Sequence, residues 1–305
     1  MKKIPLEATI ASAYRFLFTR ILSVIGTVWL PLLVMGVVVA GTAYLVVPHG
    51  WWQGQFPAFG DKHPDPAELW AVFKPFAIGL PPVMLVGMVI SSMMMVGLLR
   101  LALGRTKSSY IFFSLGADVW RLLVAMILLL LLIVLFYFVA VGVAVAGTVL
   151  LKPLVPHAAW IIATVVLVIA AICFPIYAVV RMAFFLPAVV VAEHKIGLGR
   201  AWHLGGSNFW RIVLVFLVIV IPVGIVAGMV MNIAIMPVLG NQLMRFQDAP
   251  TPAEMGAFFR ALLPLIPVFL GVSVLQRIAI NALMAGAIGS AYNALNPKPE
   301  ENAAA

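Results

Sequence analysis

The residues of this chain best suited to chemistry are arginines that interrupt long apolar stretches. Arg100, Arg181 and Arg277 each follow a run of uncharged residues, and each is followed by an aliphatic or methionine residue and then alanine. A guanidinium group binds phosphate through parallel hydrogen bonds, so arginines at the edge of a membrane suit an anionic lipid headgroup. One hypothesis is that the three side chains converge around a pseudo-threefold axis and hold such a headgroup. The favoured interpretation is three independent side chains that reach toward water at the interface.

Arg277 has the most unusual position of the three. Only sixteen residues separate it from Arg260, which is about 24 Å of helix, and uncharged residues continue through Ser290. Either Arg260 is drawn toward the outer interface, or Arg277 lies below the inner one. All ten acidic residues fall outside the apolar stretches, so no carboxylate inside the membrane is predicted to pair with Arg277. The same distribution argues against a proton relay.

Glu193 and His194 form an adjacent acid and base in a polar connection. They could act as a catalytic pair, but pairing of Glu193 with Arg200 or with an arginine at the start of an apolar stretch is the favoured interpretation. A lipid enzyme would need Glu193, His194 and His203 to meet in one pocket. No zinc-protease, phosphate-loop, nucleophile-elbow or paired-cysteine motif occurs. We therefore predict no catalysis, no cofactor and no metal, and interpret His63 as part of a solvated Pro-rich loop.

Composition shows which elements must position these residues. The 305 residues are 64% apolar and 10% charged, and the mean hydropathy is +1.15, whereas globular chains are about 25% charged. This excludes a soluble enzyme, a disordered protein and a secreted disulfide scaffold. The net charge is +9, but the basic residues are spaced singly, which favours a membrane protein over a nucleic-acid-binding protein.

Six apolar stretches are each long enough to cross a bilayer, which takes about 20 residues. They are Ile21–Val47, Pro75–Leu99, Leu122–Leu151, Ala158–Val180, Ile212–Leu239 and Ala261–Gln276, the last resuming past Arg277. Apolar residues at helical spacing between Leu6 and Phe18 predict an in-plane helix before the first stretch. We predict an all-α polytopic membrane protein with six transmembrane helices. Fourteen of the 19 Lys and Arg residues fall on the side of both termini, which predicts cytoplasmic N- and C-termini.

The six stretches resemble three parallel helical-hairpin pseudo-repeats, at about residues 1–104, 105–192 and 193–295. They form a single transmembrane domain over 1–295, followed by a disordered tail at 296–305. Each copy opens at a start arginine beside aromatic residues and closes at an end arginine. The start arginines are Arg20, Arg121 and Arg211, and the end arginines are Arg100, Arg181 and Arg277. Pro31 and Pro222 both lie eleven residues after a start arginine, which predicts kinks near the midplane.

The stretch RMAFFLPAVVVAEHKIGLGRAWHLGGSNFWRIVLVFLVIVIP, from Arg181 to Pro222, carries a family resemblance. It resembles the bacterial membrane domain attached to some glycerophosphoryl diester phosphodiesterases, and related six-span inner-membrane proteins. The family's Ser-Trp pair is missing where Gly205 and Gly206 precede Ser207. The positions that fit are Arg181, Glu193, Gly197, Ala201, Asn208, Trp210 and Arg211.

The resemblance covers about a third of the chain, including the segment Ala11–Pro31, and implies the six-span topology rather than an activity. No stretch here has room for the phosphodiesterase barrel that carries the family's chemistry. The resemblance also marks a candidate motif on the inner side, made of Glu193, Asn208, Trp210 and Arg211.

These observations predict a non-enzymatic, multi-pass protein of a bacterial plasma membrane that associates with lipids, anionic ones included, or with a membrane-protein partner, and not with nucleic acid. One alternative is a transporter or permease component for a small or lipid-like anionic substrate. It requires a continuous polar cavity lined by Asn232, Ser273 or Gln276. The second alternative is the integral-membrane lipid enzyme.

Overall fold

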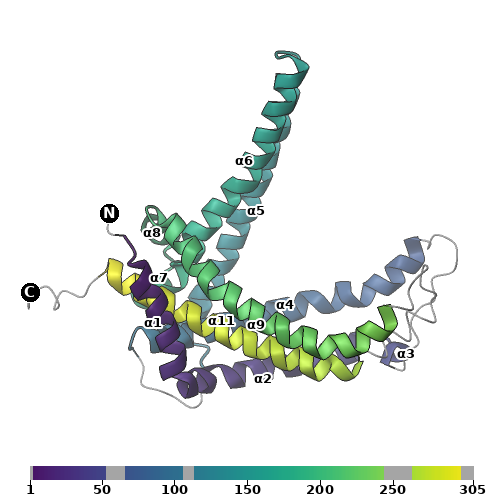
Figure 1. Ribbon diagram of the computed structural model, residues 1–305, viewed down its shortest axis with the longest axis vertical. Coiled ribbons are helices and arrows are strands. Elements are labelled where there is room, and N and C mark those ends of the chain that lie inside the picture. Colours follow the sequence, from purple (N-terminus) through teal and green to yellow (C-terminus); the bar gives the residue numbers. More distant parts are fainter. Residues whose placement is uncertain (1–2, 53–65, 106–112, 244–262, 297–305) are drawn as a thin grey trace, which may run out of the picture.

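The computed structural model describes residues 3–52, 66–105, 113–243 and 263–296, and within these ranges the chain is helical without any strand (Figure 1). Six helical stretches are long and apolar enough to cross a membrane, which confirms the predicted fold class and the number of spans. The helices are α1 (Leu6–Thr19), α2 (Ile21–Val46), α3 (His49–Trp52), α4 (Pro66–Ala102), α5 (Ala117–Leu151), α6 (His157–Ala183), α7 (Leu186–Glu193), α8 (Leu198–Gly205), α9 (Phe209–Leu243), the short 3-10 helix η1 (Leu263–Leu265) and α11 (Ile266–Leu295).

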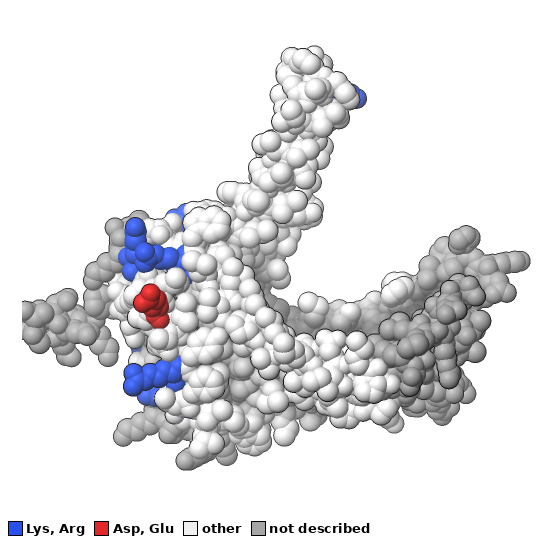
Figure 2. All heavy atoms as spheres, in the orientation of Figure 1, with Lys and Arg blue, Asp and Glu red and all other residues white. Residues whose placement is uncertain are grey.

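The long helices form two arms that diverge from a common base (Figure 1). One arm is the bundle of α2, α4, α9 and α11, and the other is the hairpin of α5 and α6, which pack along each other. Between Ala117 and Leu129 six α5 residues are buried, but beyond Leu129 only Ala144 is buried. The outer two-thirds of α5 therefore contacts little besides α6, and Figure 2 shows the two arms separated beyond the base.

Basic side chains gather at the base, where the two arms meet (Figure 2). We call this base the charged end. The beginning of α1 and the end of α11 lie there as well (Figure 1). Consecutive long helices pack against each other as α2 with α4, α5 with α6 and α9 with α11. This is the hairpin pairing that the predicted repeats require, although the equivalence of the three copies stays a prediction.

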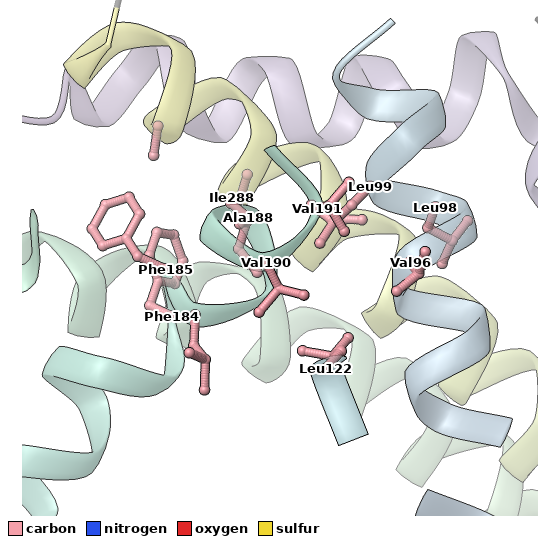
Figure 3. Packing of buried hydrophobic residues seen from close by; sticks show 14 of the residues in the cluster. Val96, Leu98, Leu99, Leu122, Phe184, Phe185, Ala188, Val190, Val191 and Ile288 are labelled. Carbon is pink, nitrogen blue, oxygen red and sulfur yellow. The ribbon is translucent and has the colours of Figure 1, made fainter. Parts of the chain in front are cut away.

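The apolar core of the charged end is built around α7. Residues Leu186 to Val191 of this short helix are all buried, and Phe184 and Phe185 form the turn that leads into it from α6 (Figure 3). A buried helix end needs partners for its last carbonyl groups. Arg105 supplies them, since its Nη1 and Nη2 donate to the carbonyls of Val191 and Ala192 at 2.8 Å and 2.9 Å. The Arg105 guanidinium group thus provides the hydrogen-bond donors that the buried end of α7 lacks.

The helix predicted before the first span is α1, and it docks on α9 and α11. Pro222 lies inside α9 and has no N–H, so the carbonyl of Val218 loses its helical donor. Tyr14 replaces that donor, with its hydroxyl 2.9 Å from the Val218 oxygen. On the other side α1 approaches α11 closely, because a Cβ added to Gly286 would lie 3.0 Å from the Cα of Ala13. One face of the amphipathic helix is therefore held by protein.

Candidate functional site

Asp118, in the first turn of α5, is the centre of a cationic cluster at the charged end. Its Oδ2 accepts a hydrogen bond from Arg100 Nη2 at 2.6 Å, and its Oδ1 accepts one from Arg121 Nη1 at 3.0 Å. Nδ1 of His194 lies 2.9 Å from the same Oδ1. We call Arg100, Asp118, Arg121 and His194 the Asp118 cluster. It joins the end of α4, the start of α5 and the residue after α7.

Local structure explains why these four side chains meet. Asp118 and Arg121 are three residues apart and so share one face of α5, and a carboxylate is favourable at a helix N-terminus. Arg100 is in the last turn of α4. His194 ends α7 with a left-handed backbone, at φ 54°, which turns the chain toward α5. The cluster thus forms where three helices end or begin.

The charges of the Asp118 cluster do not balance. One carboxylate faces two permanently charged guanidinium groups, and His194 adds a further positive charge when it is protonated. The Asp118 side chain is 4% exposed, whereas Arg100, Arg121 and His194 are 27%, 40% and 58% exposed. The negative charge is therefore the most buried part of the cluster, whereas each guanidinium group donates one hydrogen bond to it and stays partly exposed. Such a surface suits an anion with several oxygens.

Glu193 belongs to a second group of polar side chains beside the Asp118 cluster. Its carboxylate accepts from Lys195 Nζ at 2.9 Å, Arg200 Nε at 3.4 Å and the Tyr292 hydroxyl at 3.1 Å. Of the two kinds of partner predicted for Glu193, Arg200 is the one that the structure shows. In the part of the chain that the structure describes, no hydrogen bond joins Glu193 to His194 or His203. The arrangement that a lipid enzyme would need thus gains no support.

Arg181 links α6 to α8. Its Nε donates to the carbonyl of Trp202 at 3.1 Å, and its Nη1 donates to the Tyr177 hydroxyl at 2.8 Å. The guanidinium carbon also lies 3.9 Å from the centre of the Trp202 ring. A Cβ on Gly205 would lie 2.1 Å from the Arg181 carbonyl oxygen, and one on Gly206 would lie 2.5 Å from Nη2. The two glycines, where the resembled family has Ser-Trp, make this close approach possible.

The three end arginines have separate partners. Arg100 binds Asp118, Arg181 binds Trp202 and Tyr177, and Arg277 donates to the Ser91 hydroxyl at 2.6 Å. Within the described ranges no hydrogen bond connects one end arginine to another, and they share no partner. A headgroup site made of Arg100, Arg181 and Arg277 together stays a prediction. Of the three, Arg100 belongs to the Asp118 cluster.

Two residues of the candidate inner motif meet at the N-terminal segment, and two do not. Asn208 is buried, and its Oδ1 accepts from the backbone N–H of Ile4 at 2.9 Å. Arg211 donates to the carbonyl of the same residue. Trp210 is 74% exposed and contacts the ring of Phe209. Glu193 belongs to the separate group described above. Asn208 and Arg211 therefore hold Ile4 at the start of α9.

Asp118 was not among the predicted site residues, although the spacing of the repeats contains a signal for it. Asp118 lies three residues before the start arginine Arg121, and Asn208 lies three residues before Arg211. Both side chains are buried and hydrogen-bonded. A polar residue at this position in two copies could have been found by aligning the copies on their start arginines.

The polar cavity that a transporter would need gains no support either. Asn232 donates to the carbonyl of Gly228 in its own helix at 2.9 Å. Gln276 lines a groove of about 370 Å³ between α1, α9 and α11, and apart from Gln276 and Tyr14 its lining is apolar. Among the described residues no group of three or more His, Cys, Asp or Glu could hold a metal. His63 and the predicted tail beyond residue 296 lie outside the described residues.

No family model, curated protein or solved structure matches this chain. The resemblance to the membrane domain of glycerophosphoryl diester phosphodiesterases thus rests on the sequence motifs alone and stays a prediction. The six long apolar helices define the class of the protein. It is an all-α integral membrane protein with multiple spans.

Proposed function

We propose that this protein is a non-enzymatic module of a bacterial plasma membrane that binds anionic lipid headgroups at the cytoplasmic surface. The Asp118 cluster is the binding site. The observation that carries the proposal is its charge arrangement, in which Arg100 and Arg121 surround one buried carboxylate and remain partly exposed. A phosphate oxygen takes the N–H donors that Asp118 leaves unused. The adjacent His194 adds a donor of its own.

The rest of the charged end supports the same proposal. Several further arginines donate to neutral carbonyl groups, so their charges are not cancelled; they are Arg20, Arg105, Arg181 and Arg211. Basic residues beside an anionic leaflet contribute about 1 kcal/mol each to membrane attraction. The preference of the inner side for Lys and Arg thus gives the protein its orientation and brings anionic lipids to the Asp118 cluster. The apolar outer surfaces of the two arms contact lipid chains or a membrane-protein partner.

Thermal unfolding of the purified protein in detergent tests this function. Phosphatidylglycerol should raise the melting temperature, since a ligand of the folded state stabilises it. Phosphatidylcholine at the same concentration should have little effect, and the gain should shrink in high salt. Arg121→Gln should reduce the gain. Lys152→Gln removes an equal charge from the far end of α5 and serves as the control. Equal stabilisation by the two lipids would contradict the proposal.

A further inference from the structure

Arg277 lies far from the charged end, and two independent measures agree on this. Ser91, which its guanidinium contacts, precedes Arg100 by nine residues in α4, or about 14 Å of helix. On α11, Gly289 is level with the end of α4, because a Cβ there would lie 3.2 Å from the Cβ of Ala102. Arg277 precedes Gly289 by twelve residues, or about 18 Å of helix. Arg277 is therefore within the span, at about half the thickness of a hydrocarbon core of roughly 30 Å.

The charge of Arg277 is not compensated by its partner. Ser91 is neutral, and its hydroxyl engages one of the five N–H donors of the guanidinium group. Arg100, by contrast, has a carboxylate, and Arg181 has a carbonyl, a hydroxyl and two aromatic rings. In the described part of the spans no carboxylate contacts Arg277, whose side chain is exposed at the surface of the bundle.

A charged group in hydrocarbon with unused donors is costly, so it draws water or an anion to itself. A neighbour on the same helix does not supply the anion, since α11 contains no acidic residue. The most abundant anions of a bilayer are its lipid phosphate groups, and the basic residues of the charged end draw anionic lipids into the leaflet on that side. A lipid whose phosphate reaches toward Arg277 keeps its chains in the hydrocarbon beside the bundle.

We propose that Arg277 and Ser91 form an anion-binding site inside the membrane, which binds the phosphate of a phospholipid drawn below the level of its neighbours. Phosphate oxygens accept from the free guanidinium N–H groups, and the Ser91 hydroxyl accepts from Nη2 and donates to a further phosphate oxygen. The site is separate from the Asp118 cluster, and either one can exist without the other. A lipid phosphate and free inorganic phosphate offer the same oxygen acceptors. The experiment must therefore show which of the two Arg277 binds.

Solid-state NMR of the protein in phosphatidylglycerol bilayers measures the contact directly. The protein is labelled with ¹³C at arginine Cζ, and the loss of carbon signal through dipolar coupling to ³¹P is recorded in phosphate-free buffer. Arg277→Lys keeps the charge, and with it the fold, but removes this one labelled carbon. We expect the wild type to contain a phosphorus-coupled component that Arg277→Lys lacks and Arg121→Gln retains. Identical spectra of the wild type and Arg277→Lys would overturn the proposal.

Bilayers of a phosphorus-free glycolipid separate the two sources of phosphate. In these glycolipid bilayers, with inorganic phosphate in the buffer, the phosphorus-coupled signal of the Arg277 carbon should be absent. Its appearance under these conditions would overturn the assignment to a lipid. As a second measurement, native mass spectrometry should show that Arg277→Gln weakens the most tightly held phosphatidylglycerol by about tenfold. Lys152→Gln should leave that lipid in place. If Arg121→Gln loses lipid and Arg277→Gln does not, the proposed site at Arg277 and Ser91 is wrong, whereas the Asp118 cluster is supported as a headgroup site.

Discussion

Asp118 and Asn208 share one relationship to a neighbouring arginine, since each lies three residues before a start arginine and each is buried at the charged end. The two side chains perform related tasks with different partners. Asp118 gathers Arg100, Arg121 and His194 from three elements. Asn208 accepts the backbone N–H of Ile4 and so attaches the N-terminal segment to α9. The charged end is thus assembled around one buried carboxylate and one buried carboxamide.

Without the Asp118 carboxylate, the positive charges of Arg100 and Arg121 should lie close together with no negative charge between them. Asp118→Ala is expected to lower the free energy of unfolding by about 2–3 kcal/mol. This is less than the loss for a fully buried ion pair, because Arg100 and Arg121 keep contact with water. Unfolding in detergent measures the loss. Glu7→Ala, at an exposed carboxylate of α1, should be neutral, and equal stability of the two variants would show that the Asp118 cluster is not structural.

Without the Asn208 carboxamide, the N-terminal segment at Ile4 should detach from the start of α9. Asn208→Ala leaves the Ile4 N–H buried without its acceptor, at a cost of about 1–3 kcal/mol. Hydrogen exchange at the start of α1 should become faster in this variant. Asn208→Asp keeps an acceptor oxygen and should preserve protection, and His203→Ala, at an exposed side chain of α8, should have no effect. Unchanged exchange in Asn208→Ala would refute the attachment.

Two glycines of α8 should respond oppositely to the same substitution. Gly205→Ala places a methyl group 2.1 Å from the Arg181 carbonyl oxygen, so α6 and α8 must separate. Gly199→Ala has no neighbour within 4 Å and should stabilise the helix by about 0.5–1 kcal/mol. Melting temperatures in detergent should fall for Gly205→Ala and stay level or rise for Gly199→Ala. A harmless Gly205→Ala would contradict the close contact.

The stability that the hydrogen bond from Tyr14 to α9 contributes should depend on Pro222. Tyr14→Phe removes the donor to the Val218 carbonyl and should cost about 1 kcal/mol. Pro222→Ala restores a helical N–H for that carbonyl, so in this background Tyr14→Phe should cost less. A double-mutant cycle on unfolding free energy measures the coupling. Strict additivity would mean that Tyr14 does not replace the missing helical donor.

The sequence predicted the six spans because each contributes a long apolar run, and a bilayer demands that length. It predicted the pairing of Glu193 with Arg200 because the two lie close together in one short connection. Asp118 was missed because its partners Arg100 and His194 come from other helices, and helical periodicity carries no information on such contacts. The divergence of the α5–α6 arm was also not predicted, since lipid-facing and protein-facing apolar residues look alike in sequence.

Pairs of small residues four positions apart show the same limit of sequence information. Gly224 and Gly228 form one such pair and Ala282 and Gly286 another, yet of the three glycines only Gly286 contacts a neighbouring helix, α1. A Cβ on Gly224 or Gly228 would meet nothing within 4 Å. Spacing shows that close approach is possible, and the packing partner decides whether it occurs.

The proposed function depends on the excess positive charge of the Asp118 cluster, which should bind an anionic headgroup. Native mass spectrometry of phosphatidylglycerol release tests it most directly, because two variants change the charge in opposite directions. Asp118→Asn removes the buried negative charge and should tighten binding about fivefold, although it destabilises the fold, whereas Arg121→Gln should weaken binding about fivefold. Equal retention of phosphatidylglycerol by both variants and the wild type would contradict the proposed function.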